Sequence, residues 1–108
     1  MTTLQEAFDL LLSRNRSAFD ETDFDCAYHL LASALHLAQA MGNSTGLDGI
    51  CHLANEQGAT IDRDHADYKH STVRAEERGN RSIFAALSQQ AHNASFIVRQ
   101  QATRSKSE

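Results

Sequence analysis

Apolar residues recur at the spacing of one helix face in three long stretches of the chain. The first stretch runs from Thr3 to about Phe19, the second begins at Phe24, and the third runs from about Ser82 to Gln101. Positions i, i+3, i+4 and i+7 lie on one side of an α-helix, so each stretch is expected to form an amphipathic helix. The residues of the last stretch that are expected to face inward are Ile83, Phe84, Leu87, Ala91, Ala94, Ile97 and Val98.

The second stretch carries the widest apolar stripe. Cys26, Leu30 and Leu37 widen one flank of it, so two neighbouring helices are needed to cover the whole stripe. Gly42 follows the last apolar residue, and glycine ends helices because a left-handed backbone costs it nothing. The stripe itself is expected to consist of Phe24, Ala27, Tyr28, Leu31, Ala34, Leu35, Ala38 and Met41.

The middle of the chain has a weaker pattern. A third helix is expected to carry Leu47, Ile50 and Leu53 and to pause at Gly58. The stretch 61–78 is helical by propensity but holds few apolar side chains. It either continues the third helix through Gly58 or packs separately after a bend there.

These patterns, together with the absence of proline, predict an all-α fold. We expect an antiparallel bundle of four to five helices that forms a single domain over residues 1–101. The polar residues 102–108 are expected to be a disordered tail.

Composition narrows the class of protein. A chain of 108 residues has the length of one domain, and 41% hydrophobic and 22% charged residues are typical of globular proteins. The net charge of −4 disfavours a nucleic-acid partner, because duplex binders need a basic face. No run approaches the ~18 apolar residues of a membrane span, and no signal-peptide pattern is visible. We therefore predict a cytoplasmic protein with neither a membrane nor a nucleic-acid partner.

The two cysteines are predicted to be free thiols. A hairpin turn near residue 44 places Cys51 opposite Leu37 and Cys26 opposite Asp62. Their sulfur atoms should then lie far beyond bonding range, which argues against an intrachain disulfide.

Two segments resemble the helices of tetratricopeptide-like hairpins. "DFDCAYHLLASALHLAQAMGN" is similar to the second helix of such a repeat, and "GLDGICHLANEQG" to the first helix of the next, although Gln57 stands where that family usually has an aromatic residue. The matching positions are Ala27, Leu31, Ala34, Ile50, Leu53 and Ala54. The resemblance implies helices stacked in hairpins, and two "GN" dipeptides at 42–43 and 79–80 add a faint internal echo. The chain also resembles small bacterial all-α proteins without an assigned function, which implies no chemistry.

Four of the candidate residues lie on the second and third helices. His29 and His36 share a face that points away from the core, and we expect both to be solvated. The alternative is that this face meets a second copy of the chain or binds a metal between subunits. His52 and Glu56 have i, i+4 spacing, and a surface hydrogen-bonded pair is favoured there over a metal site.

The segment "RDHADYKH" at 63–70 gathers acidic, basic and imidazole side chains. On a helix, Asp67 and His70 would supply two metal ligands, and Asp64 or Asp62 a third. Alternating charge on a helix with few apolar residues is also how an exposed helix stays soluble. We favour the solvated helix face and keep the metal site as the alternative.

A catalytic alternative uses two residues of the same segment. Arg63, six intervening residues and His70 resemble the Arg-x(4–6)-His pattern of HEPN ribonucleases, which are small all-α domains that dimerise. The resemblance implies that His70 would be the acid or base acting on the RNA 2′-hydroxyl and that Arg63 would stabilise the phosphate. The acidic balance of the chain does not favour an RNA partner.

A non-enzymatic protein-interaction or scaffold domain without a cofactor fits these observations best. We expect a homodimer that buries the flank of Cys26, Leu30 and Leu37, because removing an apolar edge from water stabilises the fold. The HEPN-like ribonuclease and the metal-binding bundle are the alternatives.

Overall fold

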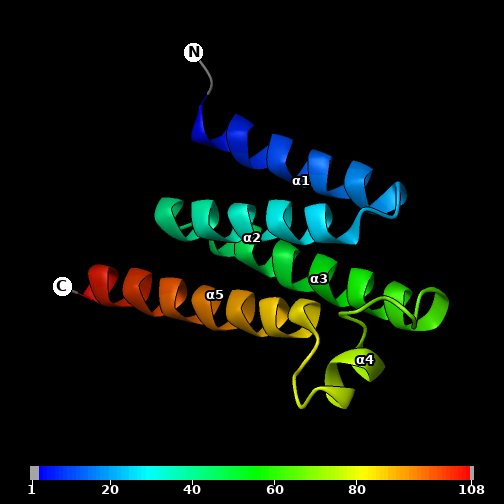
Figure 1. Ribbon diagram of the computed structural model, residues 1–108. Coiled ribbons are helices and arrows are strands. Elements are labelled where there is room, and N and C mark those ends of the chain that lie inside the picture. The colour runs from blue at the N-terminus through cyan, green and yellow to red at the C-terminus, as the bar shows by residue number, and fades with distance from the viewer. Residues whose placement is uncertain (1–2, 108) are drawn as a thin grey trace.

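The computed structural model describes residues 3–107, which form five helices and no strand (Figure 1). The helices are α1 (Leu4–Asp20), α2 (Phe24–Met41), α3 (Ser44–Asp64), α4 (Thr72–Glu77) and α5 (Ile83–Ser107). The prediction of an all-α bundle is confirmed. None of the described helices is long and apolar enough to cross a membrane.

Side-chain caps set the ends of the first three helices. Thr3 accepts a hydrogen bond from the Glu6 backbone nitrogen at 3.1 Å, and Asp23 and Asn43 cap α2 and α3 in the same way. Gly42 ends α2 in the left-handed conformation, with φ of 65°. Such caps satisfy backbone groups that have no partner inside the helix.

The helices pack as two antiparallel hairpins, α1 with α2 and α3 with α5 (Figure 1). The register of the second hairpin shows in two contacts: the Cys51 Sγ lies 3.3 Å from the Ser88 Oγ, and the Ser95 hydroxyl lies 2.6 Å from Asp48. The Cα atoms span 51 × 34 × 17 Å. A thickness of 17 Å fits two layers of helices, whose axes pack about 8–10 Å apart.

The core fills the space between the hairpins. Its fully buried large side chains include Leu31, Leu47, Ile50 and Leu87, all of which were expected to be apolar contact positions. The stripe predicted for α2 is confirmed by the burial of Phe24, Ala27, Leu31, Ala34, Leu35 and Ala38. For α5 the prediction was wrong at Ile97, which is 54% exposed.

A buried amide pair joins α1 to α3. The Gln57 Nε2 donates to the Asn15 Oδ1 at 2.6 Å, and the Asn15 Nδ2 donates to the Ala27 carbonyl at 2.7 Å. Both amides are almost fully buried. Gln57 thus replaces with hydrogen bonds the aromatic packing that the tetratricopeptide-like resemblance would supply at this position.

The middle of the chain decides between the two alternatives that the sequence left open. α3 does not pause at Gly58 but continues through it and ends at Asp64. Gly58 lies close to α5, since a Cβ there would lie 3.3 Å from the Phe84 Cβ. The helix that pairs with α3 is α5, whereas the stretch 61–78 forms the end of α3, a loop and the short α4.

The last helix, α5, runs past Gln101 to Ser107, and the domain boundary at 101 stays a prediction.

The two "GN" dipeptides have the same local geometry. Gly79 has φ of 74°, close to that of Gly42, and Asn43 and Asn80 each donate a 2.9 Å backbone hydrogen bond to an alanine carbonyl five residues earlier. The similarity between the two segments is limited to these dipeptides, because α4 has 6 residues and α2 has 18.

Candidate functional site

The segment "RDHADYKH" does not form the exposed helix that was expected. Residues 65–71 are a loop between α3 and α4. Asp62 holds both ends of the loop together, since it accepts hydrogen bonds from the Thr72 backbone nitrogen at 2.8 Å and from the Thr72 hydroxyl at 2.7 Å. The buried Ser71 hydroxyl donates to the Ala66 carbonyl at 2.7 Å. With few apolar side chains to bury on a helix face, these hydrogen bonds favour a loop over a continued helix.

The loop is fastened to the start of α2. The Tyr68 hydroxyl donates to Asp25, and the Lys69 Nζ lies 3.0 Å from the same carboxylate. The Phe24 ring contacts the rings of His65 and Tyr68 at centroid distances of 5.0 and 5.2 Å. The hydrogen bonds from Tyr68 and then Lys69 lower the pKa of Asp25, while burial and then Asp25 raise the pKa of Tyr68. The segment therefore works as a structural clamp.

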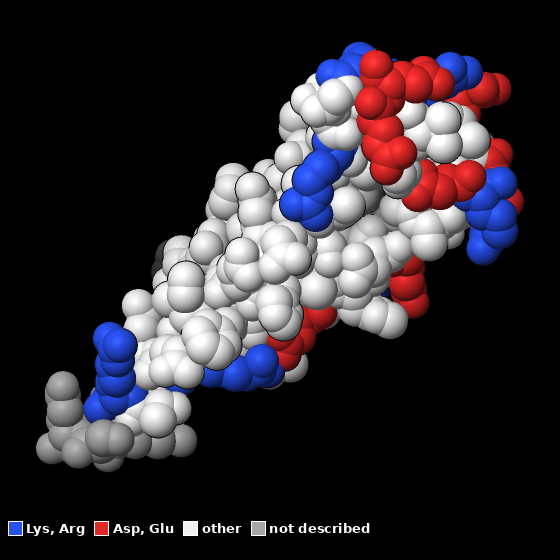
Figure 2. All heavy atoms as spheres, turned by 90° about the horizontal axis from the view of Figure 1, so that it is seen from below, with Lys and Arg blue, Asp and Glu red and all other residues white. Residues whose placement is uncertain are grey.

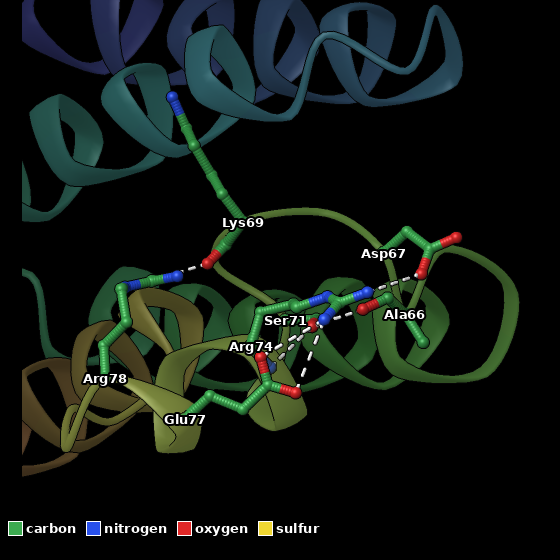
Figure 3. A network of polar contacts seen from close by, with 7 residues as sticks. All are labelled: Ala66, Asp67, Lys69, Ser71, Arg74, Glu77 and Arg78. Carbon is green, nitrogen blue, oxygen red and sulfur yellow. Dashed lines mark hydrogen bonds and ion pairs between the residues drawn. The ribbon is translucent and has the colours of Figure 1, made fainter.

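The remaining charges of the loop pair mainly with their own neighbours (Figure 3). Arg74 lies 3.0 Å from Asp67 and 3.2 Å from Glu77, and the Arg78 guanidinium donates to the Lys69 carbonyl. Such exposed pairs are screened by solvent and contribute little to stability. They orient the loop more than they stabilise the fold.

The three candidate metal ligands do not gather into one site. Asp64 pairs with Arg63 through hydrogen bonds of 3.1 and 3.0 Å, and Asp67 faces Arg74. His70 is half-buried, and its pKa is lowered by burial first and then by neighbouring cations. Among the described side chains, no three of His, Cys, Asp and Glu lie together closely enough to hold a metal ion.

The two candidate ribonuclease residues line different hollows. Arg63 and Asp64 border one of about 550 Å³, and His70, Arg78 and Arg81 border another of about 540 Å³. Within one chain Arg63 and His70 therefore share no cavity, and Arg63 is already paired with a carboxylate. The roles that the HEPN resemblance implies stay a prediction.

The candidate histidines of α2 and α3 lie where they were expected. His29 and His36 are exposed. The His52 Nε2 lies 2.8 Å from Glu56, which confirms the surface pair at i, i+4 spacing.

The flank of Cys26, Leu30 and Leu37 is only partly open. Cys26 is exposed, whereas Leu30 and Leu37 are half-buried and Leu37 packs against the main core. Cys26 and Cys51 are both free thiols, as predicted. An interface on this flank stays a prediction, and the adjoining outer side of α2 is more open.

A surface without charged side chains extends over α2 and α5. No Asp, Glu, Lys or Arg occurs between Asp25 and Asp48 or between Arg81 and Arg99. These intervals form most of α2 and the larger part of α5, and the two helices contact each other. In Figure 2 charges gather at the end that holds α4, while the surface over α5 is largely free of them. We call the neutral face the exposed residues His29, Ser33, His36, Gln39, Ala40, Gln89, Gln90, Asn93, Phe96 and Ile97.

A groove of about 360 Å³ lies between α2 and α5 within the neutral face. His36 and Gln39 line it from α2, and Asn93 and Ile97 line it from α5. Ile97 is 54% exposed and the adjacent Phe96 is 60% exposed. Exposed apolar side chains among uncharged amides have the composition of the core of a protein interface.

Sequence reasoning missed the neutral face, although a signal for it exists in the chain. That signal is the pair of charge-free intervals, which has no meaning as a site until the fold places α2 beside α5. No protein-family model, curated protein or solved structure matches this chain.

Proposed function

We propose that this chain is a non-enzymatic protein-interaction domain that binds its partner through the neutral face. The observation that carries the proposal is the charge-free surface of α2 and α5, with Phe96 and Ile97 exposed beside the groove. Charged residues are depleted and aromatic residues enriched in interface cores, and exposed apolar groups that lie together mark interaction sites. A cytoplasmic location is part of the same proposal.

The charged end of the molecule supports a role by contact. Arg63, Lys69 and Arg74 each pair with a carboxylate of the chain itself. The pairs of Lys69 and Arg74 hold the loop between α3 and α4 in place, so the chemistry of "RDHADYKH" supports a structural role. The interaction surface and the charged loop are then separate parts of the molecule.

Two matched glutamate substitutions test the proposal. Ile97→Glu puts a charge at the groove, and Val73→Glu puts the same charge on α4 at a side chain of nearly equal exposure, 56% against 54%. Tagged wild type is used to capture protein from a cell extract, the captured protein is purified, and its Kd is measured for all three forms. We expect Ile97→Glu to weaken binding at least about tenfold and Val73→Glu to leave it unchanged.

Thermal midpoints of both variants serve as the folding control. Because each replaced side chain is more than half exposed, both midpoints should stay near that of the wild type when dilute protein without a bound partner is measured. A purified partner that binds Ile97→Glu as tightly as the wild type would show that the neutral face is not the binding surface.

A further inference from the structure

We infer that the partner of the neutral face is a second copy of this chain, bound face to face across a two-fold axis. The inference rests on the proposed function and names the partner of that same surface. A two-fold interface sets a patch of surface against its own copy, so the patch must be complementary to itself. Charge, hydrogen bonding and size each test whether the neutral face meets that requirement.

Charge distribution favours self-pairing through this side of the molecule. A charged residue near a two-fold axis faces the same charge on the other copy, which is unfavourable. The chain carries a net charge of −4, and none of its formal charges lies in the neutral face. The side formed by α1 and α3 instead exposes Asp9, Arg16 and Glu56. Two copies therefore approach most easily through α2 and α5.

The hydrogen-bonding groups of the face are complementary to themselves. Gln39, Gln90 and Asn93 line the groove, and an amide side chain carries both a donor and an acceptor. An amide can thus pair with the same amide of a second copy and leave neither group unsatisfied. A carboxylate only accepts and an ammonium only donates, so neither can pair with its own kind.

The molecule is also large enough on this side to form a stable dimer. A standard interface covers about 800 Å² per partner, which is roughly an eighth of the 6696 Å² surface of this chain. The two larger extents of the body, 51 and 34 Å, leave room for an interface of that area. The exposed Phe96 and Ile97 lie within it and supply apolar contact.

Two double variants of opposite charge test the inference. Q39K/N93K and Q39E/N93E change exposed helical positions of the face to good helix formers, so both should fold. S13K/N55K puts the same added charge on exposed positions of α1 and α3 and is the control. The mass of each full-length protein is measured by native mass spectrometry and sedimentation velocity over a range of concentrations.

Wild type and S13K/N55K are expected to be dimers. Each charged face variant should have a dimer dissociation constant at least about tenfold higher, because like charges then meet across the axis. An equimolar mixture of Q39K/N93K and Q39E/N93E should recover the dimer, whereas mixing with S13K/N55K should not give Q39E/N93E a mixed dimer tighter than the S13K/N55K homodimer. If the neutral face pairs with its own copy, the dimer should recover only in the mixture of the two oppositely charged face variants.

Three outcomes would overturn the inference. The wild type could be a monomer at all concentrations, both face variants could remain dimers, or the oppositely charged mixture could stay monomeric. Each leaves the proposed function standing, because the capture experiment with Ile97→Glu tests binding to a different partner independently. Failure of both experiments would remove the proposed function as well.

Discussion

Replacing Asn15 by alanine should destabilise the fold by about 2–4 kcal/mol. The Asn15 side chain is fully buried and exchanges hydrogen bonds of 2.6 and 3.2 Å with Gln57, which is 4% exposed. Alanine at position 15 leaves the Gln57 amide buried without these partners, and each unsatisfied buried group costs about 1–3 kcal/mol. The Ala27 carbonyl also loses the 2.7 Å hydrogen bond from Asn15, which adds a smaller amount.

Urea denaturation followed by circular dichroism measures this effect. With a slope of about 1–3 kcal/mol/M for a small protein, the expected loss moves the midpoint down by roughly 1–2 M. The chain supplies a control outside the neutral face, since the Gln5 amide donates a 3.0 Å hydrogen bond to Asp9 on the exposed surface of α1. Gln5→Ala should change the free energy of unfolding by less than about 0.5 kcal/mol.

A double variant separates the loss of a hydrogen bond from the loss of packing. Asn15→Leu/Gln57→Leu removes both polar partners together, so no amide is left unsatisfied, and it should cost less than the sum of the two single leucine variants. The difference, a coupling energy of about 1–3 kcal/mol, is the quantity to measure. Strict additivity, or an Asn15→Ala variant as stable as Gln5→Ala, would refute the assignment of the pair as a structural tie between α1 and α3.

Three further predictions concern the loop, its candidate residues and the glycines of α3. Because the pKa of Asp25 is lowered in the folded protein, its carboxylate stabilises the fold above the unfolded pKa of about 3.9, and this contribution is lost as the pH falls through the folded pKa. As the pH is lowered from about 6 to 2, the thermal midpoint should therefore fall more steeply for wild type than for Asp25→Asn. Arg63→Ala and His70→Ala should leave the dimer dissociation constant within about twofold, whereas RNA cleavage by the wild type that either variant abolishes would favour the ribonuclease instead. Gly49→Ala should raise the free energy of unfolding by about 0.5–1 kcal/mol, because a Cβ there meets nothing within 4 Å, while Gly58→Leu should lower it by about 1–3 kcal/mol, because its Cβ would lie 3.3 Å from a side-chain atom of α5.

The helices that carry wide apolar stripes could be predicted from the sequence alone. α2 begins at Phe24 and ends before Gly42 as expected, because burial of the stripe and the C-terminal glycine act locally and agree with each other. Ile97 shows the limit of the same reasoning. Its place at the edge of the α5 stripe depends on which helices lie beside α5, and that is decided by tertiary packing.

The segment at 63–70 could not be predicted, because its conformation depends on residues far away in the sequence. Helix propensity favoured a continuous helix, but Asp25, more than forty residues earlier, binds Tyr68 and Lys69 and draws the segment into a loop. The sequence left open whether α3 continues through Gly58 for a similar reason. Only the position of Phe84 shows that this glycine permits close contact between α3 and α5.

Ionic strength distinguishes a dimer that uses the neutral face from one that uses the charged loop. Raising the salt concentration from about 0.1 to 1 M shortens the Debye length from ~10 to ~3 Å. The neutral face has no ion pair to screen, and screening weakens the repulsion between two chains of net charge −4, so the dimer dissociation constant should stay the same or fall. An interface built on Arg63, Asp64 and Asp67 would instead lose its attraction.

Sedimentation equilibrium at several salt concentrations measures the dimer dissociation constant. The mixed dimer of Q39K/N93K and Q39E/N93E is the positive control, because its ion pairs should weaken with salt. A wild-type dimer that weakens in parallel with that mixed dimer would place charged residues in the interface and contradict the assignment of the neutral face.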